Sequence, residues 1–235
     1  MNNLSLSSIG KKLIMSLTGL FLVLFLIFHA TMNLVAAFSP TGYDAICKFL
    51  GANWYALVGT MVLAAGFLIH ILMSMVITLN NRKARGSERY ATVTRPAQVS
   101  WASKNMFVLG AIVLGFICLH LWQFWAKMQL VELMYGHDWA QYTTIDPTSG
   151  STLIAYYFSN PCYVVCYLLW LVAIWFHLTH GFWSGFQTLG WNNTKWLPRL
   201  ECVGKWFATL ICLAFAAVVV VIYIKSLCCG AACAL

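Results

Sequence analysis

The feature that most constrains this chain is a set of long stretches without a charged side chain. One lies between Lys12 and Asp44, and another runs from Phe49 to Asn81. The hydrocarbon core of a bilayer is about 30 Å thick, so one helical crossing takes roughly 20 apolar residues. Only 9% of the 235 residues are charged and 61% are hydrophobic, whereas roughly a quarter of the residues in soluble domains are charged. We therefore expect an integral membrane protein and exclude a water-soluble globular domain.

The uncharged stretches predict an all-α bundle of five transmembrane helices that forms a single domain. This domain covers residues 1–235, with spans at about 13–38, 54–79, 105–127, 161–189 and 206–225. The first span follows Lys11 and Lys12 as a signal peptide would, but it exceeds the ~7–15 apolar residues of a signal peptide and shows no convincing cleavage site. We therefore expect it to be retained as a membrane helix.

Two local signals refine the second half of the chain. Asn160 and Pro161 predict the start of the fourth span, because Asn caps free amides and Pro is pre-organised at the first helical position. In the long polar connection before them, we expect a partial helix or an interfacial turn near Val131 to Tyr135.

Basic residues lie mainly on one side of the predicted bundle. The larger set comprises Lys11, Lys12, Arg82, Lys83, Arg85, Arg89, Arg95, Lys104, Lys195, Arg199 and Lys205, and the smaller set Lys48, Lys127 and Lys225. Because cytoplasmic loops are enriched in Lys and Arg, we expect a cytoplasmic N-terminus and a C-terminus on the outer face. The net charge of +8 would suggest nucleic acid in a soluble protein. Here the basic residues fall in short loops between spans, which excludes nucleic acid as a partner and leaves membrane lipid.

Histidines are the clearest functional candidates inside the predicted spans, because ionisable groups are expensive there and need a role. His29 lies 17 residues after Lys12, and His120 lies 16 residues after Lys104. At a rise of about 1.5 Å per residue, both stand roughly 24–25 Å above the cytoplasmic boundary. We therefore expect these two imidazoles to be level with each other.

A second pair of histidines lies nearer the cytoplasmic side. His70 precedes Arg82 by 12 residues, and His180 precedes Gly190 by 10. These spacings place the two imidazoles about 18 Å and about 15 Å from that side. His177 shares a helix face with His180, so spacing alone does not choose between them.

Two pairs of imidazoles on four helices predict two haem groups. Neutral imidazoles from separate helices can hold a haem iron from both sides inside a helix bundle. The chain contains no CxxCH motif, so the haem is expected to be non-covalent and b-type. The alternative is a histidine-lined path for protons or a metal ion, although such a transporter is expected to carry intramembrane carboxylates as well.

Two segments also resemble a known family. They are Ser16 to Phe25 (SLTGLFLVLF), followed by His29, and His177 to Gln187 (HLTHGFWSGFQ). Both are similar to the di-haem cytochrome b subunit of succinate:quinone oxidoreductases and quinol:fumarate reductases, in the form with a single five-helix membrane subunit. The resemblance covers nearly the whole chain, and His-Gly at the fourth ligand position is its most specific local feature.

The resemblance implies a non-flavin subunit of a respiratory enzyme in the bacterial cytoplasmic membrane. Such a subunit anchors a flavoprotein and an iron–sulfur subunit on the cytoplasmic face and relays electrons between their clusters and a quinone, here expected to be menaquinone. The implied iron ligands are His70 and His180 for the inner haem, with His177 as the alternative to His180, and His29 and His120 for the outer haem. The residues offered for the inner haem propionates are Ser16, Trp101, Gln187 and Lys195.

The quinone is expected beside the outer haem, because two haems in series are needed only if the quinone lies far from the cytoplasmic clusters. Asp44 is the acid best placed there to accept protons from a quinol. Some fumarate reductases of this type carry a proton-conducting glutamate two residues before the fourth histidine, whereas this chain has Leu178. The proton route attributed to that glutamate is therefore not expected here.

Several properties stay open from the sequence. Another respiratory complex, such as a hydrogenase, a formate dehydrogenase or a ferric reductase, could use the same di-haem cytochrome, and a haem-free transporter is a third reading. The sequence does not choose between fumarate reduction and succinate oxidation. It also leaves open the oligomeric state, including a dimer of the whole complex, and the role of Cys228, Cys229 and Cys233 near the C-terminus.

Overall fold

The computed structural model describes residues 7–85 and 100–232, and the regular structure in these residues is helical. The five long helices are α1 (Ser8–Phe38), α3 (Trp54–Arg85), α5 (Met106–His120), α8 (Pro161–Thr188) and α9 (Trp196–Ala232). Each of these five is long and apolar enough to cross a membrane. The third reaches that length because the π-helical turn η1 (Leu121–Trp125) continues α5. The prediction of a five-span helical membrane protein is confirmed. Arg89, Arg95 and Cys233 lie outside the described residues.

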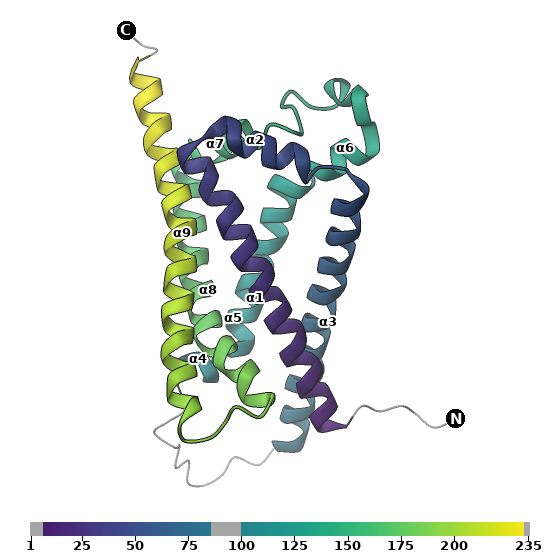
Figure 1. Ribbon diagram of the computed structural model, residues 1–235, viewed down its shortest axis with the longest axis vertical. Helices are drawn as coiled ribbons and strands as arrows, with labels where there is room; N and C mark the ends of the chain where they lie inside the picture. The colour runs from purple at the N-terminus through teal and green to yellow at the C-terminus, as the bar shows by residue number, and fades with distance from the viewer. Residues whose placement is uncertain (1–6, 86–99, 233–235) are drawn as a thin grey trace, which may run out of the picture.

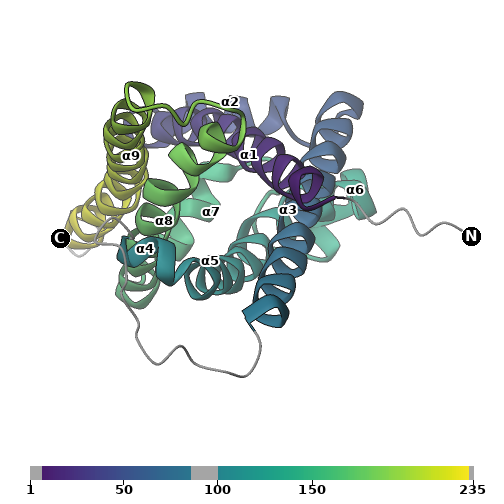
Figure 2. The ribbon, with the colours of Figure 1, turned by 90° about the horizontal axis from the view of Figure 1, so that it is seen from below.

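The five long helices run side by side, and the two ends of the chain lie at opposite ends of the bundle (Figure 1). Seen end-on, α1, α3, α5 and α8 surround a common centre, and α9 lies outside them (Figure 2). α9 packs against α8 and α1, α3 packs against α1, and α5 packs against α8. The four helices around the centre are those that carry the intramembrane histidines.

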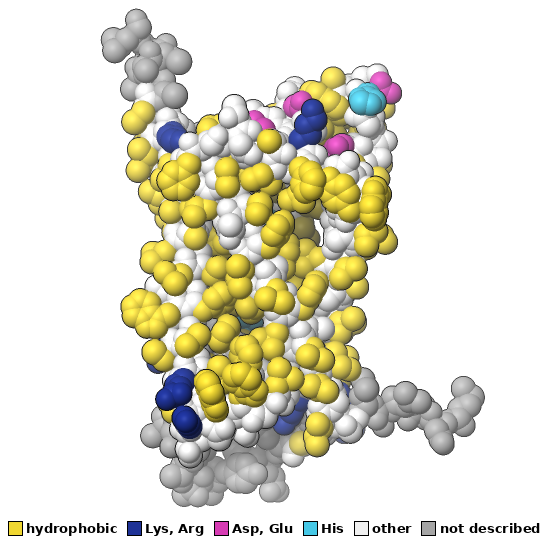
Figure 3. Space-filling model, viewed as in Figure 1, with side chains coloured by type: hydrophobic (Ala, Val, Ile, Leu, Met, Phe, Trp, Pro, Cys, Tyr) yellow, Lys and Arg dark blue, Asp and Glu magenta, His cyan; other side chains and the backbone are white. Residues whose placement is uncertain are grey.

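The surface matches that arrangement. Hydrophobic side chains cover the middle of the bundle, basic side chains gather at the lower end, and acidic side chains lie at the upper end with a few basic ones (Figure 3). On α3, for example, Met61 is 67% exposed and Leu72 is 55% exposed. Lipid tails can cover such a surface, whereas water cannot do so without a large cost. The lower end of Figure 1 is thus the end with the larger set of basic residues. We call the upper end the outer end, after the face on which the sequence predicts it to lie.

Short helices cover the outer end. They are α2 (Pro40–Phe49), α6 (Gln129–Tyr135), the 3₁₀ segment η2 (Gly136–Gln141) and α7 (Gly150–Phe158), while α4 (Trp101–Lys104) lies at the lower end. α6 confirms the partial helix expected near residues 131–135. The sequence reasoning missed α2 and α7. Leu153 and Ile154 of α7 are each 3% exposed, so this helix forms part of the core at the outer end.

The ends of α8 are fixed by local signals. The Cys162 N–H donates to Asn160 Oδ1 at 2.9 Å, and Pro161 occupies the first helical position, as predicted. At the other end, the Gly190 N–H donates to the Gln187 carbonyl, and the Trp191 N–H donates to the Phe186 carbonyl. These two bonds form a Schellman motif, which needs a left-handed residue. Gly190 supplies it with φ of 98°.

Other helix ends differ from the predicted spans. α1 begins at Ser8 rather than near 13, because the Ser7 hydroxyl caps it by accepting from the Gly10 N–H at 3.0 Å. α3 continues to Arg85, six residues past the predicted end at 79. α9 begins at Trp196 rather than near 206 and ends at Ala232 rather than near 225. Apolar stretches report the thickness of the membrane, but a helix continues into water wherever its residues are good helix formers.

Candidate functional site

The outer histidines meet in the centre of the bundle. His29 of α1 and His120 of α5 have ring centroids 5.8 Å apart and ring planes at 88°. Metal–imidazole bonds are about 2 Å long, so two rings that share one metal stand with their centres roughly 6 Å apart. The structure therefore brings this pair together at a spacing that fits bis-imidazole ligation.

Aromatic rings surround this pair. The rings in contact with His29 or His120 are Phe25, Phe215, Phe124, Tyr167 and Trp170. They come from four different helical segments and form an apolar surrounding that excludes water from the pair. A flat macrocycle is stabilised in such an environment by the burial of its apolar faces.

Polar contacts link His29 to the outer end. The Asn33 amide donates to the His29 carbonyl at 2.8 Å, and its nitrogen lies 3.3 Å from His29 Nδ1. Tyr43 of α2 donates its hydroxyl to Asn33 Oδ1 at 3.0 Å. Burial raises the pKa of Tyr43 above its ordinary value, so this hydroxyl stays protonated and keeps its role as a donor. A chain of three side chains thus connects the imidazole to the helix that covers it.

Asp44, the predicted proton acceptor, lies next to Tyr43 on α2. Its two carboxylate oxygens accept from the backbone N–H and the hydroxyl of Ser151, both at 2.7 Å. These bonds join α2 to the start of α7 and hold the carboxylate at the outer end.

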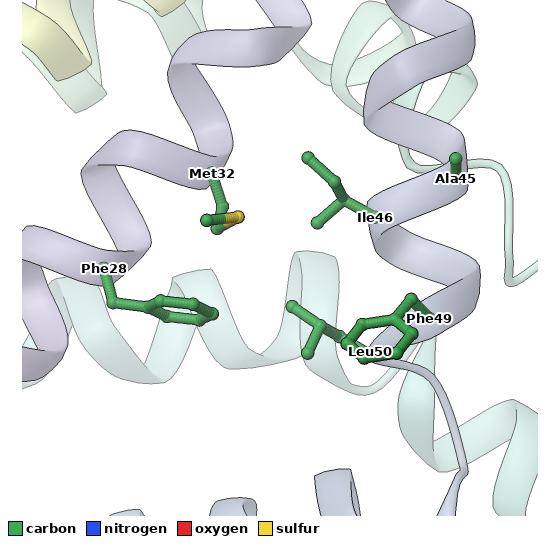
Figure 4. A pocket seen from close by; sticks show the side chains of 6 residues that line it. All are labelled: Phe28, Met32, Ala45, Ile46, Phe49 and Leu50. Atoms are coloured by element: carbon green, nitrogen blue, oxygen red, sulfur yellow. The ribbon is translucent and has the colours of Figure 1, made fainter.

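Below α2 lies an apolar pocket of about 310 Å³ (Figure 4). Phe28 and Met32 of α1 line one side of it. The other side is formed by Ala45, Ile46 and Phe49 of α2 and by Leu50, which follows α2. Phe28 is adjacent to His29 in the chain, so the pocket lies at the level of the outer imidazole pair. Sequence reasoning placed a ligand site in this region but missed the helix that forms one wall of it.

His70 of α3 lies against α1. A Cβ at Gly19 would stand 3.2 Å from His70 Cε1, so the ring packs closely on this glycine and a side chain there would press against it. Thr18 Oγ1 donates to the Ile14 carbonyl at 2.8 Å and lies 3.3 Å from His70 Nδ1. Thr18 already donates to the Ile14 carbonyl, so its oxygen can accept from His70 Nδ1–H, and in that tautomer Nε2 keeps a lone pair for a metal.

Two histidines of α8 compete for the place opposite His70. A Cβ at Gly110 of α5 would stand 3.7 Å from Cε1 of His177, so this imidazole lies against α5. Seven residues separate His177 from Trp170, which contacts His120. Seven residues make about two helical turns, so His177 points to the same side of α8 as Trp170, toward the centre. His180 instead packs edge-on against Trp183, with ring centroids 4.9 Å apart.

The two levels have the same separation on two helices. On α1, Gly19 contacts His70 and lies ten residues before His29. On α5, Gly110 contacts His177 and lies ten residues before His120. Ten residues of helix rise about 15 Å. The inner and outer imidazole pairs are therefore separated by this distance along the bundle.

The four residues offered for the inner propionates are spread over the lower end. Ser16 is 5% exposed and donates its hydroxyl to the Gly185 carbonyl at 2.5 Å. Gln187 is half-buried near the end of α8. Trp101 is 59% exposed and packs on Phe176. Lys195 is exposed in the loop before α9, away from the centre of the bundle. The structure thus brings Ser16 and the end of α8 together.

Within the described residues, no group of three or more His, Cys, Asp or Glu side chains could hold a bare metal ion. A haem iron needs only two protein ligands, because the porphyrin supplies the other four nitrogens. The donor set of two imidazoles per level therefore fits haem better than a free metal ion. His177 Nδ1 and His180 Nδ1 are buried without a hydrogen-bond partner, so the inner level has polar atoms that the protein alone does not satisfy.

Comparisons of the chain with protein-family models, with curated proteins and with solved structures find no match. The family resemblance therefore rests on the sequence segments quoted above. The arrangement of the four central helices stands independently of this resemblance.

Proposed function

We propose that this chain is the membrane anchor and electron-relay subunit of a succinate dehydrogenase or fumarate reductase complex. In this function it passes electrons between a membrane quinone, menaquinone, and an iron–sulfur subunit through two b haems. The observation that carries the proposal is the pairing of intramembrane imidazoles at two levels. His29 and His120 meet at 5.8 Å, and nearer the lower end His70 lies against Gly19 of α1 and His177 against Gly110 of α5.

His29 and His120 hold the outer iron in this proposal, and His70 with His177 holds the inner one. The inward position of His177 favours it over His180, the ligand suggested by the family resemblance. When bound, haem b supplies reversible transfer of single electrons. Two imidazoles would hold each iron, and the aromatic side chains around His29 and His120 would keep water away from the outer one.

The distribution of charge supports a direction for the relay. Basic side chains gather at the lower end of the bundle (Figure 3), and the positive-inside rule assigns that end to the cytoplasm. The flavoprotein and iron–sulfur subunits would dock there, nearest to His70 and His177. The bacterial cytoplasmic membrane is the location that fits this orientation.

The apolar pocket below α2 supports a quinone site at the outer level. Its lining of Phe28, Met32 and Ile46 suits an isoprenoid chain or a quinone ring (Figure 4). Oxidation of a quinol releases two protons, so the site needs a base within reach. Asp44 lies on the helix that forms the wall of the pocket, and we propose it as that base.

Purification of the native complex from membranes tests the proposal most directly. We expect a flavin-containing polypeptide and an iron–sulfur polypeptide to co-purify with this chain, together with two haems per chain by the pyridine haemochrome assay. If the chain contains two haems but co-purifies with a hydrogenase, a formate dehydrogenase or a ferric reductase, it would be assigned to that respiratory complex instead. A haem-free protein would refute both assignments and favour the transporter reading.

A further inference from the structure

A cluster of buried polar side chains lies beside the outer imidazole pair. Gln123 is 1% exposed and is the largest fully buried side chain in the described part of the protein. It lies on the π-helical turn η1, three residues after His120. Tyr167 of α8 donates its hydroxyl to Gln123 Oε1 at 2.6 Å, and the same hydroxyl oxygen lies 3.5 Å from His120 Nδ1. Single π-helical turns are rare and occur frequently at functional sites.

Two hydrogen-bond donors of this cluster are left without a partner. Gln123 Nε2 and Trp170 Nε1 are buried and unpaired. Trp170 is 8% exposed, and its ring centroid lies 5.7 Å from that of His120. Buried N–H groups are almost always satisfied, because an unpaired donor loses its bond to water and gains nothing.

The pairing of Tyr167 with Gln123 Oε1 explains why the Gln123 N–H donor stays available. Its hydrogen goes to Gln123 Oε1, which holds the amide with its nitrogen directed elsewhere. The indole of Trp170 has one polar atom and can only donate. Gln123 Nε2 and Trp170 Nε1 therefore each keep an N–H bond that an oxygen acceptor beside the outer imidazole pair would satisfy.

We propose that Gln123 Nε2 and Trp170 Nε1 bind such an oxygen acceptor from a group that enters the bundle at the outer level. The inference rests on the proposed function, which supplies two sources of the same chemistry. One is a propionate carboxylate of the outer haem, and the other is the carbonyl oxygen of a quinone. Tyr167 acts as a positioning residue, because it orients the Gln123 amide without donating to the acceptor.

Trp170→Phe and Gln123→Leu test the inference in the purified complex. Trp170→Phe removes the N–H but keeps a ring to stack on Phe116, whose centroid lies 5.9 Å away. Trp175→Phe is the matched control on the same helix, because the Trp175 N–H already donates to Thr209 Oγ1 at 2.9 Å. The measurements are haem content, optical redox titration of both haems, and KM for quinol.

The two sources give different results. If a propionate is bound, the midpoint potential of the outer haem falls in both variants, because the lost donors leave more negative charge at the haem edge and favour ferric iron. If a quinone carbonyl is bound, KM for quinol rises about tenfold, the cost of one lost hydrogen bond, and both potentials stay unchanged. The control matches the wild type in each case.

The inference is overturned if Trp170→Phe and Gln123→Leu both contain two haems and match the Trp175→Phe control in both midpoint potentials and in KM for quinol. That result would leave the proposed function intact. A wild-type complex without haem would overturn the proposed function and this inference together. Haem content of the wild type therefore separates the two failures.

Discussion

Removal of one α8 histidine should remove one haem, and the structure indicates which one. In the proposed function His177 and His70 hold the inner iron, so His177→Ala would leave that iron with one protein ligand. His180 packs against Trp183, with ring centroids 4.9 Å apart, and we expect it to stay there when His177 is removed. We therefore expect the inner haem to be lost and its low-spin spectrum to disappear.

The number of haems lost follows from the separation of the two imidazole levels. His29 and His120 stand about 15 Å farther along the bundle, a distance of roughly three helical turns. The outer site shares no ligand with the inner one, so its occupancy should not change. The pyridine haemochrome assay should then fall from two haems per chain to one.

The assay needs two comparisons. His180→Ala should keep two haems, and so should His137→Ala, which removes an exposed imidazole of η2 outside the membrane spans. Reduced-minus-oxidised spectra of all three variants show which haem is missing. Loss of the inner haem in His180→Ala, with two haems retained in His177→Ala, would refute the reasoning and return the ligand role to His180.

Three further predictions concern the inner level, the outer end and the quinone site. Gly19→Val should displace the His70 ring, because even a Cβ would stand 3.2 Å from its Cε1, and haem content should show loss of the inner haem with the outer one retained. Burial raises the pKa of Cys47 to about 11, so maleimide at pH 8 should label the exposed Cys228 rapidly and Cys47 slowly, as peptide mass spectrometry can show. Because the folded protein favours the neutral Cys47 thiol, burial of this thiol contributes to stability below its ordinary pKa. That contribution is lost as the pH rises through the folded-state pKa of about 11. Asp44→Asn should lower quinol-linked turnover while haem spectra and dye-linked fumarate reduction stay unchanged, and unaltered quinol turnover would remove Asp44 from the mechanism.

The outer end shows where sequence reasoning was incomplete. The segment of α2 is short and mixed in polarity, PTGYDAICKF, so it carries no signal of a membrane span. Its start is encoded locally, since the Gly42 N–H donates to Ser39 Oγ at 3.0 Å and Pro40 follows the cap. Its position over His29 depends on Tyr43 reaching Asn33, a contact between two helices that no local pattern predicts.

Gln123 gives a second example. A lone amide in the segment LWQFW, three residues after a membrane histidine, is a signal that sequence reasoning passed over. The sequence does not reveal the π-helical turn, which changes the direction in which the side chains of this segment point. Only the contact with Tyr167 shows that the amide faces the centre of the bundle.

The sequence by itself determined the number of spans and the depth of each histidine. Both follow from local physics, because the bilayer has a fixed thickness and every helical residue adds the same rise. It could not decide which way each helix is turned about its own axis. That rotation is set by packing between helices, here by Gly19 against His70 and Gly110 against His177. Only the tertiary structure therefore shows that His177 packs against Gly110 of α5, a contact that spacing along the sequence does not predict.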